Sequence, residues 1–237
     1  MEIAPLGDAA LVVRIRDRFE DAPEKTLNDV LNVLQRLEDA QIPGIIELAP
    51  AYTTVAVFFD PARVIDAAGE PDCVMEWLTQ KIYETLTHGK RKQVKHAAAR
   101  WVEIPVCYDP EFALDLDHVA DHARMSRKEV VDLHSAAEYR VNCIGFTPGF
   151  PYLTGLPGKL ATPRRATPRK EIPTGSVAIG GAQTGIYPQV SPGGWNVIGR
   201  TPLRLFDPQK DPPVLLRAGN RVRFRAIARE EFEALKS

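Results

Sequence analysis

The sequence has few cysteines, no long apolar segment and almost no net charge. Its three cysteines, Cys73, Cys107 and Cys143, are scattered and form no Cys-x-x-Cys pair, which is typical of a protein from a reducing compartment without a disulfide framework. No apolar run approaches the ~20 residues that a membrane helix needs. The N-terminus also lacks the basic and apolar regions of a signal peptide. We therefore expect a cytoplasmic protein that does not insert into membranes.

The net charge of −1 at neutral pH creates no overall field that would attract nucleic acid or a membrane surface. Hydrophobic residues make up 44% and charged residues 26% of the 237 residues, which is ordinary for a soluble protein with a proper core. This length suffices for two small domains. We place them at residues 1–90 and 91–237.

The first domain is predicted to be α+β. Its clearest helix covers 24–39, because apolar residues recur there at helical spacing: Leu27, Val30, Leu31, Leu34 and Leu37. Strands are expected at 2–6, 9–15, 45–49 and 53–59, and a second helix, opened by Pro61 or Pro71, is best at 72–87. With a strand at 101–106, the order β-α-β-β-α-β predicts a ferredoxin-like sheet, although that last strand could instead belong to the second domain.

The basic segment 88–100, HGKRKQVKHAAAR, has no apolar pattern. We interpret it as a linker or a long surface loop, because charge runs are usually solvated. A phosphate-binding patch is the alternative.

The second domain is predicted to be a barrel of short strands. Most of the chain's 16 glycines and 20 prolines lie between Gly145 and Pro213, interleaved with β-branched and aromatic residues. Such a mixture favours strands joined by tightly specified turns over disorder, and many short strands favour a closed barrel. Two short helices at 115–123 and 126–136 precede them, and Ser126 with Glu129 forms a capping-box pattern.

Four blocks of this domain resemble a known family: GFTPGFPYL (145–153), ATPRRATPRKEIPTGSVAIGG (161–181), QTGIYPQVSPGGWNVIGRTPL (183–203) and LRAGNRVRF (216–224). They are similar to the signature blocks of the bacterial 5-oxoprolinase B-subunit family, also called allophanate hydrolase subunit 1 or the KipI-type kinase-inhibitor family. The resemblance implies a cyclophilin-like barrel after a smaller α/β domain. It also implies a role beside subunits A and C in the ATP-dependent opening of 5-oxo-L-proline to L-glutamate.

One histidine is a candidate general acid or base. His134 lies close before the glycine-rich blocks, with Glu138 four residues on. It could equally be a helix-end histidine favoured by the helix dipole. His118 and His122 have a spacing that can hold a metal, but a solvated polar face explains them better. Ser176 is interpreted as the start of a strand, since the lysine and second serine of amidase chemistry are missing.

Three arginines in PRRATPR, Arg164, Arg165 and Arg169, are held between prolines on an extended backbone. Arginine offers a rigid bidentate fork for a carboxylate or phosphate. Two interpretations remain open. The arginines bind a ligand, or they pair with carboxylates elsewhere in the chain and fasten a long loop.

A further set of residues lies on the loops that glycine and proline shape. Aromatic rings with a few polar groups on rigid loops make a small-molecule pocket or a protein contact surface. The predicted substrate-binding or partner-binding residues of this kind are Phe146, Thr147, Pro148, Phe150, Tyr152, Gln183, Tyr187 and Trp195.

No nucleotide motif is evident, because GGAQTG (180–185) lacks the Gly-Lys-Ser/Thr end of a phosphate-binding loop. We therefore expect ATP, with Mg²⁺, to act at the level of the complex, and the active site to be shared between subunits. The resemblance leaves two alternatives: inhibition of a sensor histidine kinase through the barrel, and allophanate hydrolysis.

Overall fold

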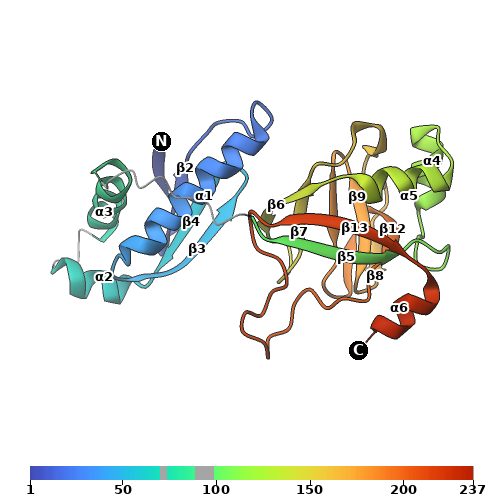
Figure 1. The fold of residues 1–237 in the computed structure, drawn as a ribbon. Helices are drawn as coiled ribbons and strands as arrows, with labels where there is room; N and C mark the ends of the chain where they lie inside the picture. The colour runs from blue at the N-terminus through green and yellow to red at the C-terminus, as the bar shows by residue number, and fades with distance from the viewer. Residues whose placement is uncertain (70–73, 89–98, 237) are drawn as a thin grey trace. The chain divides into compact units, whose positions relative to one another are not determined.

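The computed structural model describes residues 1–69, 74–88 and 99–236. The chain divides into two compact units, Met1–Ala98 and Ala99–Ser237, which are drawn in Figure 1. The boundary predicted near residue 90 and most of the basic segment 88–100 lie outside the described residues.

In its described residues, the first unit is a four-stranded antiparallel sheet with three helices. Its strands are β1 (Glu2–Pro5), β2 (Ala10–Arg14), β3 (Ile45–Ala51) and β4 (Thr54–Phe59), in the order β1-β2-β4-β3. The helices are α1 (Pro23–Ala40), α2 (Pro61–Ala68) and α3 (Val74–His88). Val13, Val55 and Val57 alternate on the inner face of the sheet and pack in one core with Val30 of α1 and Leu78 of α3.

The predicted order of this sheet was wrong in its last strand. β5 (Trp101–Cys107) pairs with β13 (Arg221–Ile227) in the second unit and not with the N-terminal sheet. The β2-α1-β3 segment does enclose β4 as a split βαβ requires, but the outer place beside β2 is taken by β1. β5 joins the second unit because it pairs with β13 at seven positions. β1 takes the place beside β2 because a short turn connects the two strands.

The helix that follows β4 is also divided in two. Asp60 caps α2 by accepting from the backbone N–H of Ala62, at 3.0 Å, and of Arg63. Gly69, in the left-handed conformation, ends it. The predicted helix 72–87 corresponds to α3 from residue 74 onward, and residues 72 and 73 lie outside the described residues.

The second unit is built on a closed barrel, as predicted. β5, β6 (Tyr139–Ile144), β7 (Pro151–Thr154), β9 (Ser176–Gly180), β10 (Gln183–Ile186), β12 (Asn196–Arg200) and β13 close in the order β10-β7-β6-β13-β5-β12-β9. β8 (Arg169–Ile172) and β11 (Ser191–Gly193) form a separate pair, and Gly158–Leu160 forms a 3-10 turn. The cyclophilin-like type of this barrel stays a prediction.

Three helices accompany the barrel: α4 (Leu116–Ala123), α5 (Arg127–Ala136) and α6 (Arg229–Leu235). α5 begins with the predicted capping box, in which Glu129 N–H donates to the Ser126 hydroxyl and the Glu129 carboxylate accepts from Ser126 N–H. In the described part of the chain, no helix is long and apolar enough to cross a membrane.

Strand β9 is buried on both faces. Val177 and Ile179 point into the barrel core, whereas Ala178 points outward into a second cluster with Phe150, Tyr187 and Trp195. The outer face of this strand is therefore covered by aromatic rings from three loops. Those loops belong to the family-like blocks of the sequence.

Candidate functional site

The aromatic cluster, defined as Phe146, Phe150, Tyr152, Tyr187 and Trp195, lies on backbone that only glycine could provide. A Cβ at Gly180 would clash with the indole of Trp195, and one at Gly193 would clash with the hydroxyl of Tyr187. A Cβ at Gly185 would lie 2.9 Å from Phe150 Cζ and 3.0 Å from Trp195 Cζ3. The density of glycine in this region therefore has a structural cause, since the rings lie directly on the strands.

The rings pack edge to face. Phe150 lies at the centre, with ring centroids 5.6 Å from Phe146, 4.9 Å from Tyr152, 5.2 Å from Tyr187 and 5.6 Å from Trp195. This geometry suits the charge distribution of aromatic rings and makes the cluster rigid.

Phe146 departs from the rest of the cluster in exposure and conformation. Its side chain is 59% exposed, whereas Phe150 is 2% and Trp195 5% exposed. Its φ is +67°, a conformation that costs a bulky L-residue about 1–3 kcal/mol. The neighbouring Thr147 hydroxyl is buried without a hydrogen-bond partner in the described part of the chain. The GFTPGF turn thus holds a large apolar side chain in water at an energetic cost, which points to a binding surface.

Arg164 adds a positive charge to this surface. Its guanidinium lies 5.7 Å from the ring centroid of Trp195, a cation–π distance. Within the described ranges it forms no hydrogen bond or ion pair, and its side chain is exposed. Burial raises the pKa of Tyr187 to about 12 and raises the pKa of Tyr152 as well, while Arg164 opposes both shifts. Both hydroxyls stay protonated near neutral pH and can donate hydrogen bonds.

The other two arginines of PRRATPR have a structural role. Arg165 Nη1 donates to the carboxylate of Asp115 at 2.6 Å, and Arg169 donates to it at 2.6 and 2.9 Å. Asp115 is 3% exposed and also accepts from Val197 N–H at 2.8 Å. Of the two interpretations of these arginines, pairing with a carboxylate that fastens the loop therefore applies to Arg165 and Arg169. Arg164 is the arginine whose side chain is exposed and can bind a ligand.

His134 lies in the barrel core, away from solvent. Its ring stacks on Phe224 at 4.5 Å between centroids; Nδ1 lies 2.8 Å from the Tyr108 hydroxyl and Nε2 3.2 Å from the Thr184 hydroxyl. Complete burial lowers its pKa to about 3. His134 is therefore a neutral hydrogen-bonding residue with no open side toward a substrate, and nothing in its geometry supports the catalytic prediction.

The remaining predicted residues lie near the cluster or outside it. Pro148 is exposed on the same turn as Phe146, and Gln183 is half-buried on β10 opposite Gly180. Ser176 begins β9 and is buried, as the structural interpretation requires. His118 and His122 are exposed on α4, and the described residues contain no cluster of metal-ligating side chains.

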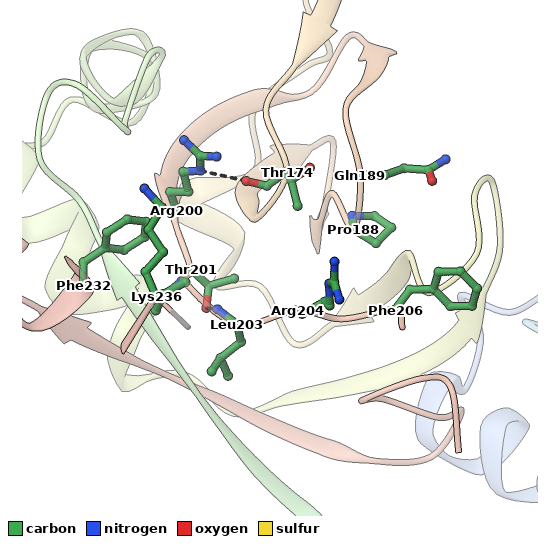
Figure 2. Close-up of a pocket in the computed structure, with 11 residues that line it drawn as sticks. Thr174, Pro188, Gln189, Arg200, Thr201, Leu203, Arg204, Phe206, Phe232 and Lys236 are labelled. Carbon is green, nitrogen blue, oxygen red and sulfur yellow. Dashed lines mark hydrogen bonds between the residues drawn. The ribbon is translucent and has the colours of Figure 1, made fainter. Parts of the chain in front are cut away.

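A second feature, the cationic pocket, was missed from the sequence. Its volume is about 380 Å³, and its wall contains Arg200, Arg204 and Lys236 together with polar and apolar side chains (Figure 2). β9 runs antiparallel to β10 and β12, so the start of β9 and the ends of its two neighbours meet at one rim of the barrel. These three points supply most of the wall, which comprises Thr174, Pro188, Gln189, residues 200–204 and Phe206. Phe232 and Lys236 from the C-terminal segment complete it. The sequence feature that could have indicated this pocket is the pair Arg200 and Arg204, which lie four residues apart in RTPLR.

Comparison with known proteins identifies the family. The family model for the carboxyltransferase domain, subdomain C and D, matches residues 1–216. A protein from Bacillus subtilis that is named as the B subunit of 5-oxoprolinase is 40% identical over 245 residues, which cover 99% of this chain and 96% of that protein. Two further proteins with this name, from Escherichia coli O157:H7 and Haemophilus influenzae, are 40% and 38% identical. The chain therefore belongs to the carboxyltransferase subdomain C and D family, among the proteins of the 5-oxoprolinase B-subunit type.

Solved structures share the fold. The crystal structure of TTHA0988 is 35% identical with a TM-score of 0.75 over 92% of this chain, and this chain spans 40% of that longer chain. Urea carboxylase from Kluyveromyces lactis, at 20% identity, has the same fold over 98% of this chain with a TM-score of 0.75. The match covers 22% of the urea carboxylase chain, so the same fold also occurs within a larger protein.

Proposed function

We propose that this chain is the B subunit of a multi-subunit 5-oxoprolinase, which opens 5-oxo-L-proline to L-glutamate with ATP and works with subunits A and C. The observation that carries the proposal is the likeness over 92–99% of the chain to three proteins named as the B subunit of 5-oxoprolinase. The likeness includes the blocks that form the aromatic cluster.

The chemistry favours a site shared between subunits. Lactam opening requires an electrophilic carbon, which phosphorylation of the amide oxygen would supply. Water then adds to that carbon, and the carbon–nitrogen bond breaks as the nitrogen takes a proton, which leaves an acyl phosphate. A second water hydrolyses this acyl phosphate to L-glutamate and phosphate. In the described part of the barrel unit, His134 is enclosed and Ser176 is buried, so neither supplies an accessible base or nucleophile. We expect the acid–base groups to come from the partner subunits.

The aromatic cluster is the proposed contribution of this chain. Phe146 and Arg164 project from a rigid base, which lowers the entropy lost on binding. The exposed ring would pack against a partner or cover the substrate, and the free guanidinium of Arg164 would bind a carboxylate or a phosphorylated intermediate. Arg165 and Arg169 are already paired with Asp115, so this proposal assigns ligand binding to Arg164 alone.

The test is glutamate formation from 5-oxoproline and ATP by co-purified A and C partners, with and without this chain. The proposal predicts that activity requires the chain and that the chain alone is inactive. Unchanged activity without it would remove the enzyme-subunit function and make the histidine-kinase interpretation the next to test, by a pull-down against kinase dimerisation domains. Lactamase activity of the purified chain alone would contradict the shared site.

A further inference from the structure

The cationic pocket has the composition of an anion site. Its wall carries Arg200, Arg204 and Lys236, and among the described residues no carboxylate contributes to it. A volume of about 380 Å³ lies within the range of small-molecule sites. The pocket is separate from the aromatic cluster, so it requires its own explanation.

The side chain of Arg200 is held in place by contacts within the fold before any ligand binds. Its Nε donates to the carbonyl of Thr174 at 2.7 Å, as drawn in Figure 2, and its guanidinium lies 5.9 Å from the ring centroid of Phe112. The terminal nitrogens have no hydrogen-bond partner within residues 1–69, 74–88 and 99–236. Because Gly175 has a φ of +81° and a Cβ there would clash with the carbonyl of Thr201, only glycine lets this turn approach so closely and bring Thr174 to Arg200.

The other two cations are held loosely. Arg204 lies 3.2 Å from Asp207 and Lys236 lies 3.6 Å from Glu233, and both cationic side chains are more than half exposed. Because the two cationic side chains are exposed, these pairs contribute little to stability, and the remaining N–H groups of Arg204 and Lys236 can turn toward a ligand. Three positively charged side chains on one pocket wall suit a divalent anion better than a monovalent one, and phosphate carries about −1.5 to −2 at neutral pH.

The rest of the wall is mixed, and its large apolar side chains are Leu203, Phe206 and Phe232. Figure 2 shows Phe206 and Phe232 at opposite ends of the pocket, and Leu203 lies on the segment between Arg200 and Phe206. An inorganic ion would leave these apolar side chains in contact with water, whereas the organic part of an organic phosphate would cover them, which is favourable.

From these contacts we infer that the pocket binds a small organic phosphate, with the phosphate group at Arg200 and the organic body against the apolar side chains. The site lies next to the aromatic cluster, because the turn at Gly149 packs on Leu205 and Phe206. The inference does not depend on the proposed function, since it concerns direct binding to this chain.

The test is calorimetric titration of the purified full chain with phenyl phosphate, inorganic phosphate and benzoate at low salt. Phenyl phosphate should bind more tightly than either of the other two. Arg200→Met should weaken its binding at least about tenfold, as expected for loss of a charge-assisted hydrogen bond, and Arg204→Met should weaken it less.

Arg217→Met is the matched control, because Arg217 is an exposed arginine of the same unit outside the pocket. A melting temperature is recorded for each variant, and Arg204→Met keeps the test valid if Arg200→Met does not fold. Absence of phenyl phosphate binding, or an equal loss in Arg217→Met, would overturn the inference. Equal binding of benzoate would overturn the phosphate assignment, and equal binding of inorganic phosphate would overturn the role of the apolar side chains.

Discussion

Arg169 holds the buried carboxylate of Asp115 through two hydrogen bonds of 2.6 and 2.9 Å. Arg165 adds a third at 2.6 Å, and the backbone N–H of Val197 adds a fourth at 2.8 Å. One carboxylate thereby joins the residue before α4, the PRRATPR loop and strand β12. The loop that presents Arg164 beside Trp195 is fastened from within the fold.

Asp115→Ala is expected to destabilise the chain by about 3–5 kcal/mol, because it leaves two part-buried arginines without their anion. Urea unfolding followed by circular dichroism measures the change in free energy of unfolding. Asp117→Ala is the control, since Asp117 is a 73% exposed carboxylate, paired with Arg127 at 3.4 Å, whose loss should cost less than about 1 kcal/mol. Equal losses in the two variants would contradict the fastening role of Asp115.

Arg164→Ala and Phe146→Ala are expected to change function and not stability. Both side chains are exposed, so each variant should unfold within about 0.5 kcal/mol of the wild type, and Phe146→Gly should gain stability by relieving the positive φ. Glutamate formation by the assembled complex should fall at least about tenfold in each alanine variant. Leu114→Ala, which removes another exposed apolar side chain of the same unit, should leave this rate unchanged, and full activity of Phe146→Ala would exclude the aromatic cluster.

Gly180→Ala tests whether Trp195 needs a glycine beneath its indole ring. The added methyl group has no room beneath the indole, and overpacking of this kind costs about 1–3 kcal/mol. The tryptophan emission spectrum should shift as the ring moves outward. Gly158→Ala is the matched control, because a Cβ there meets nothing within 4 Å and its φ is not positive; a larger effect at Gly158 would disprove the explanation.

His134 makes stability depend on pH in a stated direction. Its folded pKa of about 3 lies below the ordinary value of 6.5, so between these values the unfolded chain binds more protons than the folded chain. The free energy of unfolding should therefore fall as the pH drops below about 6.5. His134→Phe loses the contacts with Tyr108 and Thr184 and should be less stable at neutral pH, yet its stability should fall less steeply on acidification. His118→Phe controls for replacing a histidine as such; an unchanged slope in His134→Phe would refute the burial argument.

The sequence predicted local structure well. The helix at 24–39 corresponds to α1 (Pro23–Ala40), the strand at 53–59 to β4 (Thr54–Phe59), and the Ser126 capping box begins α5. Each depends on periodicity or capping within one segment, which neighbouring residues determine. The assignment of β5 failed because a strand's partner depends on hydrogen bonds to a segment more than 100 residues away along the chain, at β13.

The candidate site divides in the same way. Phe146, Phe150, Tyr152, Tyr187 and Trp195 were grouped by their shared setting of glycine and proline, and the structure brings their rings together. The three arginines of one short loop could not be told apart, because their roles depend on Asp115, about 50 residues earlier. The cationic pocket was missed because its wall comes from four separate segments.

By itself, the sequence determined the helices and strands, the barrel with its loops rich in glycine and proline, and the aromatic residues of the candidate surface. Those properties follow from side-chain size, backbone freedom and periodicity, which are local. Only the tertiary structure decided that Arg165 and Arg169 neutralise Asp115, that His134 is enclosed and neutral, and that Arg164 and Arg200 keep open donors. Burial and charge pairing join residues that are distant in the chain, and only the folded chain brings them together.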